Sequence, residues 1–210
     1  MLWRSLPLAG MAAIVVITVC VRPWVQHRRY GTSGLVLFRS GKLSQDLRDA
    51  ALVVVIALLT AQAAVAAAGR REPLLLVVGP GAIRDLLQVA GAVLMAAGIA
   101  LLASGQLNMG ASWRVGIKEG EALGLVTGGL YRFCRHPIYL GLLTAIAGYT
   151  ALLPTAVSLL LLATTYTRVR IQAAAEEAYL ERTYSATYRD YARRVGRFLP
   201  GIGRRNGLNG

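Results

Sequence analysis

The chain has 210 residues, of which 55% are hydrophobic and 16% charged, and it carries a formal net charge of +13 at pH 7. A mean hydropathy of +0.51 excludes an ordinary soluble globular domain and indicates a small polytopic membrane protein of the all-α class. The positive charge is typical of basic loops that interact with anionic lipid. Because no recognised nucleic-acid-binding motif interrupts the apolar segments, we expect no nucleic-acid partner.

Five apolar segments follow one another along the chain, and a membrane-spanning helix needs about 20 such residues. The segments are residues 6–21, 50–68, 86–104, 138–153 and 155–167. The last two are short and are separated by Pro154, which lacks an N–H and disfavours helix at the residue before it. We therefore predict about five transmembrane helices, of which the last two form a tight hairpin. No small-residue cleavage site precedes Arg22, so we expect the first helix to be retained.

The distribution of lysine and arginine predicts the orientation of these helices in a cell membrane. The connector after the first helix, the loop before the hairpin and the carboxyl-terminal region are richer in basic residues than the other exposed segments. Basic loops remain on the cytoplasmic side of a membrane. We therefore expect the amino terminus outside, with the carboxyl terminus and the loop before the hairpin both in the cytoplasm.

Three regions are predicted along the chain. Residues 1–104 hold three transmembrane helices with a basic connector, residues 105–200 form the functional core, and residues 201–210 form a disordered tail. Within the core, a polar loop precedes the hairpin, and residues 172–194 are expected to be helical. Tyrosines recur on one face of that helix, namely Tyr184, Tyr188 and Tyr191. We interpret them as side chains of an interfacial helix at headgroup depth, in preference to a stacking platform for a ligand.

Small and aromatic residues suggest how the helices pack and where they meet the interface. Gly91 and Gly98 in the third helix present small surfaces that allow another helix to approach closely. Trp24 and Trp113 are interpreted as interfacial anchors, because tryptophan is enriched at membrane–water boundaries.

Two ionisable clusters flank the predicted hairpin. Arg135 and His136 precede its first helix, and Glu176 and Glu177 follow its second. Ionisable groups at a membrane boundary are costly to dehydrate, so they pair with one another or mark a functional site. Because a hairpin returns the chain to the same face of the bilayer, we expect both clusters to contribute to one site there.

The residues of these clusters occur in blocks that resemble the isoprenylcysteine carboxyl methyltransferase family, within the integral-membrane methyltransferases that include phospholipid methyltransferases. The resemblance covers residues 113–200, a little under half of the chain. Its blocks are LVTGGLYR at 125–132, RHPIYLG at 135–141, EEAYL at 176–180 and RVGRFLP at 194–200. The resemblance implies a cytoplasmic pocket for S-adenosyl-L-methionine and a lipid-like or prenylated methyl acceptor. By position, the cofactor-binding residues are Leu125, Val126, Tyr131, His136, Pro137, Tyr139 and Glu176.

The acceptor half of the predicted site departs from the family pattern. Eukaryotic members place a substrate arginine where this chain has Gln172, so Arg168 and Arg170 become further candidates for contact with the substrate. Arg135 is expected to pair either with the cofactor carboxylate or with Glu176. No metal-ligand spacing is present, and we expect no metal. The acceptor group remains open among carboxylate, amine, thiol and hydroxyl.

Two alternative functions remain open at this point. A membrane reductase of the sterol-reductase type would use a similar His-Pro-x-Tyr segment with NADPH, although such proteins usually have more helices. A non-catalytic membrane scaffold would use Arg135 and Glu176 only as an interfacial ion pair, with His136 and Pro137 at the start of a helix.

Overall fold

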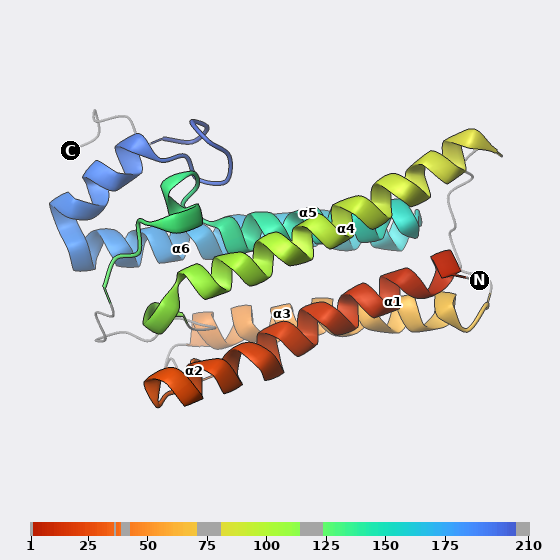
Figure 1. Cartoon of the computed structure of the whole chain (residues 1–210), viewed down its shortest axis with the longest axis horizontal. Coiled ribbons are helices and arrows are strands. Elements are labelled where there is room, and N and C mark those ends of the chain that lie inside the picture. Colours follow the sequence, from red (N-terminus) through yellow and green to blue (C-terminus); the bar gives the residue numbers. More distant parts are fainter. Residues whose placement is uncertain (1, 36, 39–42, 71–80, 114–123, 205–210) are drawn as a thin grey trace.

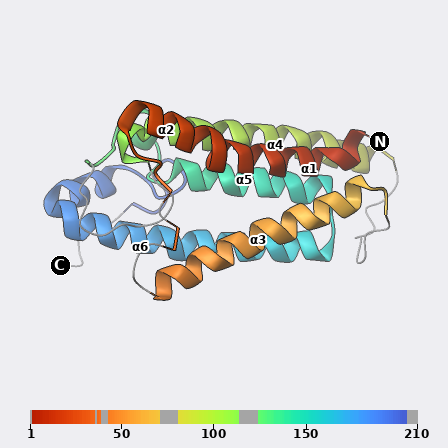
Figure 2. The ribbon, with the colours of Figure 1, turned by 90° about the horizontal axis from the view of Figure 1, so that it is seen from below.

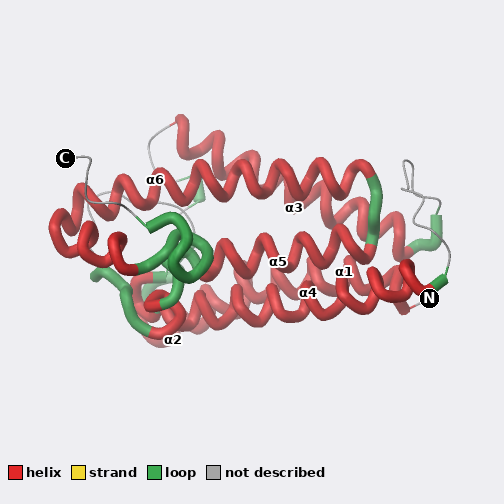
Figure 3. The backbone as a smooth tube through the Cα atoms, turned by 90° about the horizontal axis from the view of Figure 1, so that it is seen from above, coloured by secondary structure: helices red, strands yellow, loops and turns green. Residues whose placement is uncertain are grey.

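A computed structural model describes residues 2–35, 37–38, 43–70, 81–113 and 124–204. Within these ranges the chain folds into a bundle of long helices, and the described regular structure is entirely helical (Figures 1 and 3). The elements in chain order are α1 (Leu2–Val15), a π-helix (Val16–Val21), α2 (Arg22–Tyr30), α3 (Leu43–Ala67), α4 (Ala82–Asn108), two 3₁₀ helices (Gly110–Ser112 and Gly129–Arg132), α5 (Pro137–Leu152) and α6 (Ala156–Arg194).

All five predicted apolar segments are helical, which confirms the fold class. Among the described residues, three helices are long and apolar enough to cross a membrane, namely Trp3–Tyr30, Leu43–Ala67 and Ala82–Asn108, and Pro137–Leu152 is a shorter apolar helix. The first of these joins α1, the π-helix and α2, so the start of the predicted basic connector continues the helix instead of leaving it. Seen from the side, the helices run side by side, and the start of α1 and the end of α6 lie at opposite ends of the bundle (Figure 2).

The predicted hairpin is present, with its turn at Pro154. The α5 helix ends at Leu152, and Thr155 begins α6 with a capping box. In this motif the Ser158 N–H donates to the Thr155 hydroxyl at 2.9 Å, and the Thr155 N–H donates to the Ser158 hydroxyl at 3.1 Å. Residues 155–167 and 172–194, which we predicted as separate helices, form the single element α6, with a kink at Ser185 where φ is +47°.

Close packing of α4 on α5 depends on glycine, as predicted for Gly91 and Gly98. A Cβ atom at Gly98 would lie 2.3 Å from the Ala145 nitrogen and 2.6 Å from the Gly141 oxygen. Gly148 of α5 faces α4 in the same way, with 2.4 Å to the Met95 nitrogen. The two backbones therefore approach so closely that no side chain fits between them.

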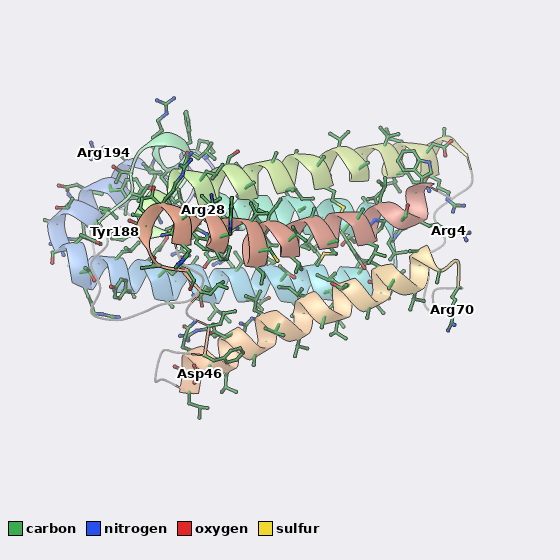
Figure 4. All side chains as sticks on the ribbon, turned by 60° about the horizontal axis from the view of Figure 1, so that its bottom comes forward. Arg4, Arg28, Asp46, Arg70, Tyr188 and Arg194 are labelled. Carbon is green, nitrogen blue, oxygen red and sulfur yellow. The ribbon has the colours of Figure 1, made fainter. Side chains whose placement is uncertain are left out.

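Charged side chains gather at the two ends of the bundle. Arg4 and Arg70 lie at the end that holds the amino terminus, and Arg28, Asp46 and Arg194 lie toward the other end (Figure 4). This distribution is that of a helical protein whose ends face water on either side of a bilayer. The cytoplasmic placement of the second end stays a prediction, as does the domain boundary at residue 104, across which α4 packs along α5.

Candidate active site

A buried carboxylate, Glu177, lies at the centre of a cluster of basic side chains where α5 begins. Arg135 Nη2 lies 2.9 Å from Glu177 Oε1, and Arg197 Nη2 lies 2.5 Å from Oε2. His136 Nε2 lies 3.2 Å from Oε1. The Glu177 side chain is completely buried. We had expected Arg135 to pair with Glu176 or with a cofactor carboxylate, and the structure pairs it with Glu177.

The electrostatics of the cluster favour an ionised Glu177. Burial by itself would raise the pKa of this carboxyl. Hydrogen bonds from His136 and Arg197, together with the charge and hydrogen bond of Arg135, outweigh burial and hold the pKa well below its usual range. Glu177 is therefore a fixed negative charge that organises the cluster, and it is not available as a proton donor near neutral pH.

The segment after α6 closes over the start of α5 and fixes Arg135. The Arg135 N–H donates to the Gly196 oxygen at 2.9 Å, and the His136 N–H donates to the Arg197 oxygen at 3.1 Å. The Arg135 guanidinium also donates to the oxygens of Val195, at 2.5 Å, and Gly203, at 3.1 Å. Gly203, in the first part of the predicted disordered tail, thus contacts the cluster, whereas residues 205–210 lie outside the described residues.

Glu176 points differently from Glu177 and faces a cavity. The Tyr139 hydroxyl donates to Glu176 Oε1, and Gln172 Nε2 donates to the same oxygen at 3.3 Å. His136 Nδ1 lies 3.7 Å from Glu176 Oε2, so the imidazole bridges the two carboxylates. With 31% of its side chain exposed, Glu176 keeps the capacity to accept further hydrogen bonds from a ligand.

The cavity has a volume of about 330 Å³, within the range of about 300–1,000 Å³ that is usual for small-molecule sites. Its lining combines polar and aromatic side chains, among them Glu176, with aliphatic side chains from α1, α3, α4 and α5. The aliphatic residues include Ile14, Val55, Ile56, Leu102 and Leu142. One cavity of the described protein therefore has both polar and apolar walls.

Most of the residues predicted from the sequence meet in this cavity. Its lining includes Leu125, Val126, Tyr131, His136, Tyr139 and Glu176, and also Arg135, Arg168 and Gln172. Pro137 is buried in the first turn of α5 and is not part of the lining. Arg170 is exposed and lies over the Tyr166 ring, outside the cavity. The predicted roles of these residues in cofactor or substrate binding stay predictions.

Several cavity residues were interpreted differently from the sequence. Tyr184, Tyr188 and Tyr191 line the cavity, and Tyr188 and Tyr191 are buried, so the interpretation of these tyrosines as a headgroup-level surface was wrong. Figure 4 shows Tyr188 toward the same end of the bundle as Arg28 and Arg194. Trp113 is 2% exposed and forms part of the cavity wall, so it is no interfacial anchor.

Arg22, the first residue of α2, binds the main chain at the end of α4, next to the cavity wall. Arg22 is buried and donates to the oxygens of Gln106, at 3.1 Å, and Gly110, at 2.7 Å. Its guanidinium lies 4.9 Å from the centre of the Trp113 ring. The sequence signal for this contact was a lone arginine at the end of an apolar run, which does not reveal its partner.

The fold and the site define a helical membrane protein with a cavity that has both polar and apolar walls. The family model described as phospholipid methyltransferase matches residues 86–187, from α4 to the kink of α6. This match and the fold confirm the resemblance to the ICMT-like integral-membrane methyltransferases. Neither supports the reductase alternative. In the part of the chain that is described, no group of three or more His, Cys, Asp or Glu could hold a metal ion.

Among solved structures, the chain is similar to the eukaryotic intramembrane Ras methyltransferase ICMT, an isoprenylcysteine carboxyl methyltransferase, with a TM-score of 0.55 and 17% sequence identity. The alignment covers 94% of this chain and 63% of that chain. The chain thus spans less than two thirds of that protein, and the likeness concerns the fold. No curated protein is significantly similar in sequence.

Proposed function

We propose that the protein is an integral-membrane methyltransferase that uses S-adenosylmethionine to methylate a lipid-like or prenylated acceptor. The observation that carries this proposal is one cavity whose lining includes both the Glu176 carboxylate and aliphatic side chains of several helices. A water-soluble methyl donor and an acceptor with an apolar tail need both kinds of wall in one site. The match to the phospholipid methyltransferase family supports the same reaction class.

The residues around Glu176 suit the methyl donor. Its amino group and sulfonium are cationic, and Glu176 offers a carboxylate that is accessible from the cavity. The walls formed by Leu125, Val126 and Tyr131 provide apolar and aromatic surface for an adenosine group. Arg135 is committed to Glu177 and to main-chain oxygens, so we assign it to holding the loop and not to the donor's carboxylate.

The protein's contribution to the reaction is positioning and exclusion of water. When bound, the cofactor supplies an activated methyl group. The Glu177 cluster fixes His136 and the start of α5, and Tyr139 and Gln172 fix the direction of the Glu176 carboxylate. Holding two reactants in line lowers the barrier without an acid–base pair. A carboxylate acceptor needs no general base, which agrees with the fixed ionisation of Glu177.

Binding of the demethylated product tests the donor half of this proposal. Glu176→Gln removes the charge that faces the cavity, and we expect S-adenosylhomocysteine to bind about tenfold or more weakly, as measured by isothermal titration in neutral detergent. Glu181→Gln, on the same helix but outside the cavity lining, is the matched control and should bind like the wild type. Equal affinity of the wild type, Glu176→Gln and Glu181→Gln for S-adenosylhomocysteine would contradict the role of Glu176 in donor binding. Binding of NADPH in place of S-adenosylhomocysteine would contradict the choice of methyl donor.

A further inference from the structure

A polar contact between the first helix and α4 forms another part of the cavity wall. Thr18 of the π-helix and Gln106 near the end of α4 both line the cavity, and Gln106 Nε2 donates to the Thr18 hydroxyl at 3.0 Å. The helices α1 and α4 lie side by side in the bundle (Figure 2). The arrangement around Glu176 and Glu177 described above uses neither residue.

The Gln106 amide is fixed in place and has one acceptor left over. The main-chain oxygen of Gln106 accepts from Arg22 Nε at 3.1 Å, so the backbone that carries the amide is held by the continuation of the first helix. Gln106 is 2% exposed, and within the described protein its Oε1 has no hydrogen-bond partner. A buried acceptor without a donor is costly, and such groups are rare in folded proteins unless a ligand or water completes them.

Thr18 comes from an unusual part of the first helix. It lies in the π-helical turn Val16–Val21, which interrupts an otherwise α-helical segment and contains neither proline nor glycine. Turns of this kind are rare and recur at functional sites. The other cavity-lining residues of this stretch are aliphatic, namely Ile14, Val15 and Val19. Thr18 therefore places a single hydroxyl group in an apolar stretch of the wall.

Together the two side chains match a neutral hydroxyl group. Such a group can donate to Gln106 Oε1 and accept from the Thr18 hydroxyl, whose hydrogen rotates freely about the C–O bond. It also suits the Gln106 amide when this is turned over, because the Thr18 hydroxyl can donate as well as accept. The pair carries no charge to compensate an ion, and Arg22 beside it already donates to the main-chain oxygens of Gln106 and Gly110.

The position of Thr18 relates the pair to the methyl acceptor and not to the donor. Thr18 lies outside residues 86–187, which match the phospholipid methyltransferase family model and hence the reaction class. The aliphatic residues around it suit an apolar tail. The walls that we assign to the donor belong to other segments, residues 125–139 and Glu176.

We propose that Thr18 and Gln106 form a hydroxyl-binding subsite that selects a methyl acceptor with a neutral hydroxyl group next to its apolar tail. The chemical class is a lipid alcohol. This inference rests on the proposed function in that the bound amphiphile is the methyl acceptor. It adds that the first helix, which lies outside the family match, determines part of the specificity.

Two amphiphiles that differ by one methyl group on oxygen test the subsite. The probes are 1-decanol and its ether 1-methoxydecane, titrated calorimetrically into the purified full chain in phosphatidylcholine nanodiscs, and each affinity is corrected for partition into empty nanodiscs. We expect decanol to bind about fivefold or more tightly than the ether, because the ether cannot donate to Gln106 Oε1.

Variants assign this preference to the pair. Thr18→Val and Gln106→Leu, singly and together, should bring the ratio of the two affinities close to one. The matched control is Thr60→Val, because Thr60 also lies in an apolar helix but donates to Ile56 of its own helix and is outside the cavity lining. It should keep the wild-type ratio.

The stability of the double variant without ligand separates a binding role from a structural one. Its Tm should equal that of the wild type, because both partners of a buried contact are replaced by apolar side chains. No preference for decanol in the wild type or an unchanged ratio in the double variant would overturn the subsite. Loss of the preference only together with a large fall in Tm would show a structural role and would also overturn it.

A parallel titration with S-adenosylhomocysteine separates this inference from the proposed function. The double variant should bind the product as the wild type does. Weaker binding of the product by the double variant would place the ribose hydroxyls of the donor at this pair and contradict the acceptor subsite. If the wild type prefers decanol but does not bind the product, the methyltransferase assignment fails while the hydroxyl subsite stands. If it binds the product but shows no preference, only the subsite fails.

Discussion

Replacing Glu177 by glutamine is expected to destabilise the protein by about 3–5 kcal/mol, because it leaves two buried or half-buried arginines without their anion. For a chain of this size that corresponds to an apparent Tm lower by about 6–20 °C. The measurement is the fraction of monodisperse protein on size-exclusion chromatography after heating in neutral detergent. Asp190→Asn is the control, because the exposed pair of Asp190 with Arg193 should contribute less than about 1 kcal/mol.

Lowering the pH should remove the same contribution of Glu177 to the stability of the wild-type protein. Because the pKa of Glu177 is depressed in the folded protein, the unfolded chain binds more protons at this site below its ordinary pKa of about 4.3. The stabilising contribution is therefore complete above that pH and decreases as the pH falls below it. The difference between wild type and Glu177→Gln should shrink accordingly. A Glu177→Gln variant as stable as Asp190→Asn at pH 7 would contradict the role of this cluster.

Adding one methyl group at Gly98 is expected to prevent normal packing of α4 on α5. The new Cβ would lie 2.3 Å from the Ala145 nitrogen, so the two backbones must separate along the interface. Overpacking costs about 1–3 kcal/mol or more, and the clash here is with backbone atoms of α5, which cannot move aside as the end of a flexible side chain can. We expect a loss of monodisperse protein in spite of the about 1 kcal/mol by which alanine favours helix over glycine.

Gly128→Ala is the matched control for this substitution. A Cβ at Gly128 meets nothing within 4 Å, and φ there is −91°, which alanine adopts freely. Gly128→Ala should therefore behave as the wild type in the same heating experiment. If Gly98→Ala and Gly128→Ala were equally stable, the close approach of α4 and α5 would be contradicted.

Local sequence signals were sufficient for the helices and the hairpin. The apolar runs are long, and Pro154 with Thr155 and Ser158 specifies a turn and a helix start through short-range chemistry. Gly98 was also readable, because a small residue on an apolar helix has few other uses than close packing. The apolar runs and the turn depend on neighbours in the chain, whereas the partner of Gly98 on α5 is visible only in the packed structure.

The site was less predictable where the partner comes from a distant segment. Glu176 and Glu177 are adjacent, and their side chains point in directions about 100° apart on a helix, so only the packed structure shows which one meets Arg135. The tyrosines of α6 form a periodic face, but periodicity does not tell whether that face meets lipid headgroups or a loop. Here it meets Leu125, which the sequence places some sixty residues away.

The most direct test of the account is methyl transfer itself. Membranes that contain the protein are incubated with S-adenosylmethionine carrying an isotopically labelled methyl group, and the lipid extract is examined by mass spectrometry. We predict a labelled amphiphile in membranes with the wild-type protein and a much smaller amount with Glu176→Gln. Equal labelling in membranes with wild type, Glu176→Gln and no protein, with the wild type shown to be folded, would contradict the proposed methyltransferase.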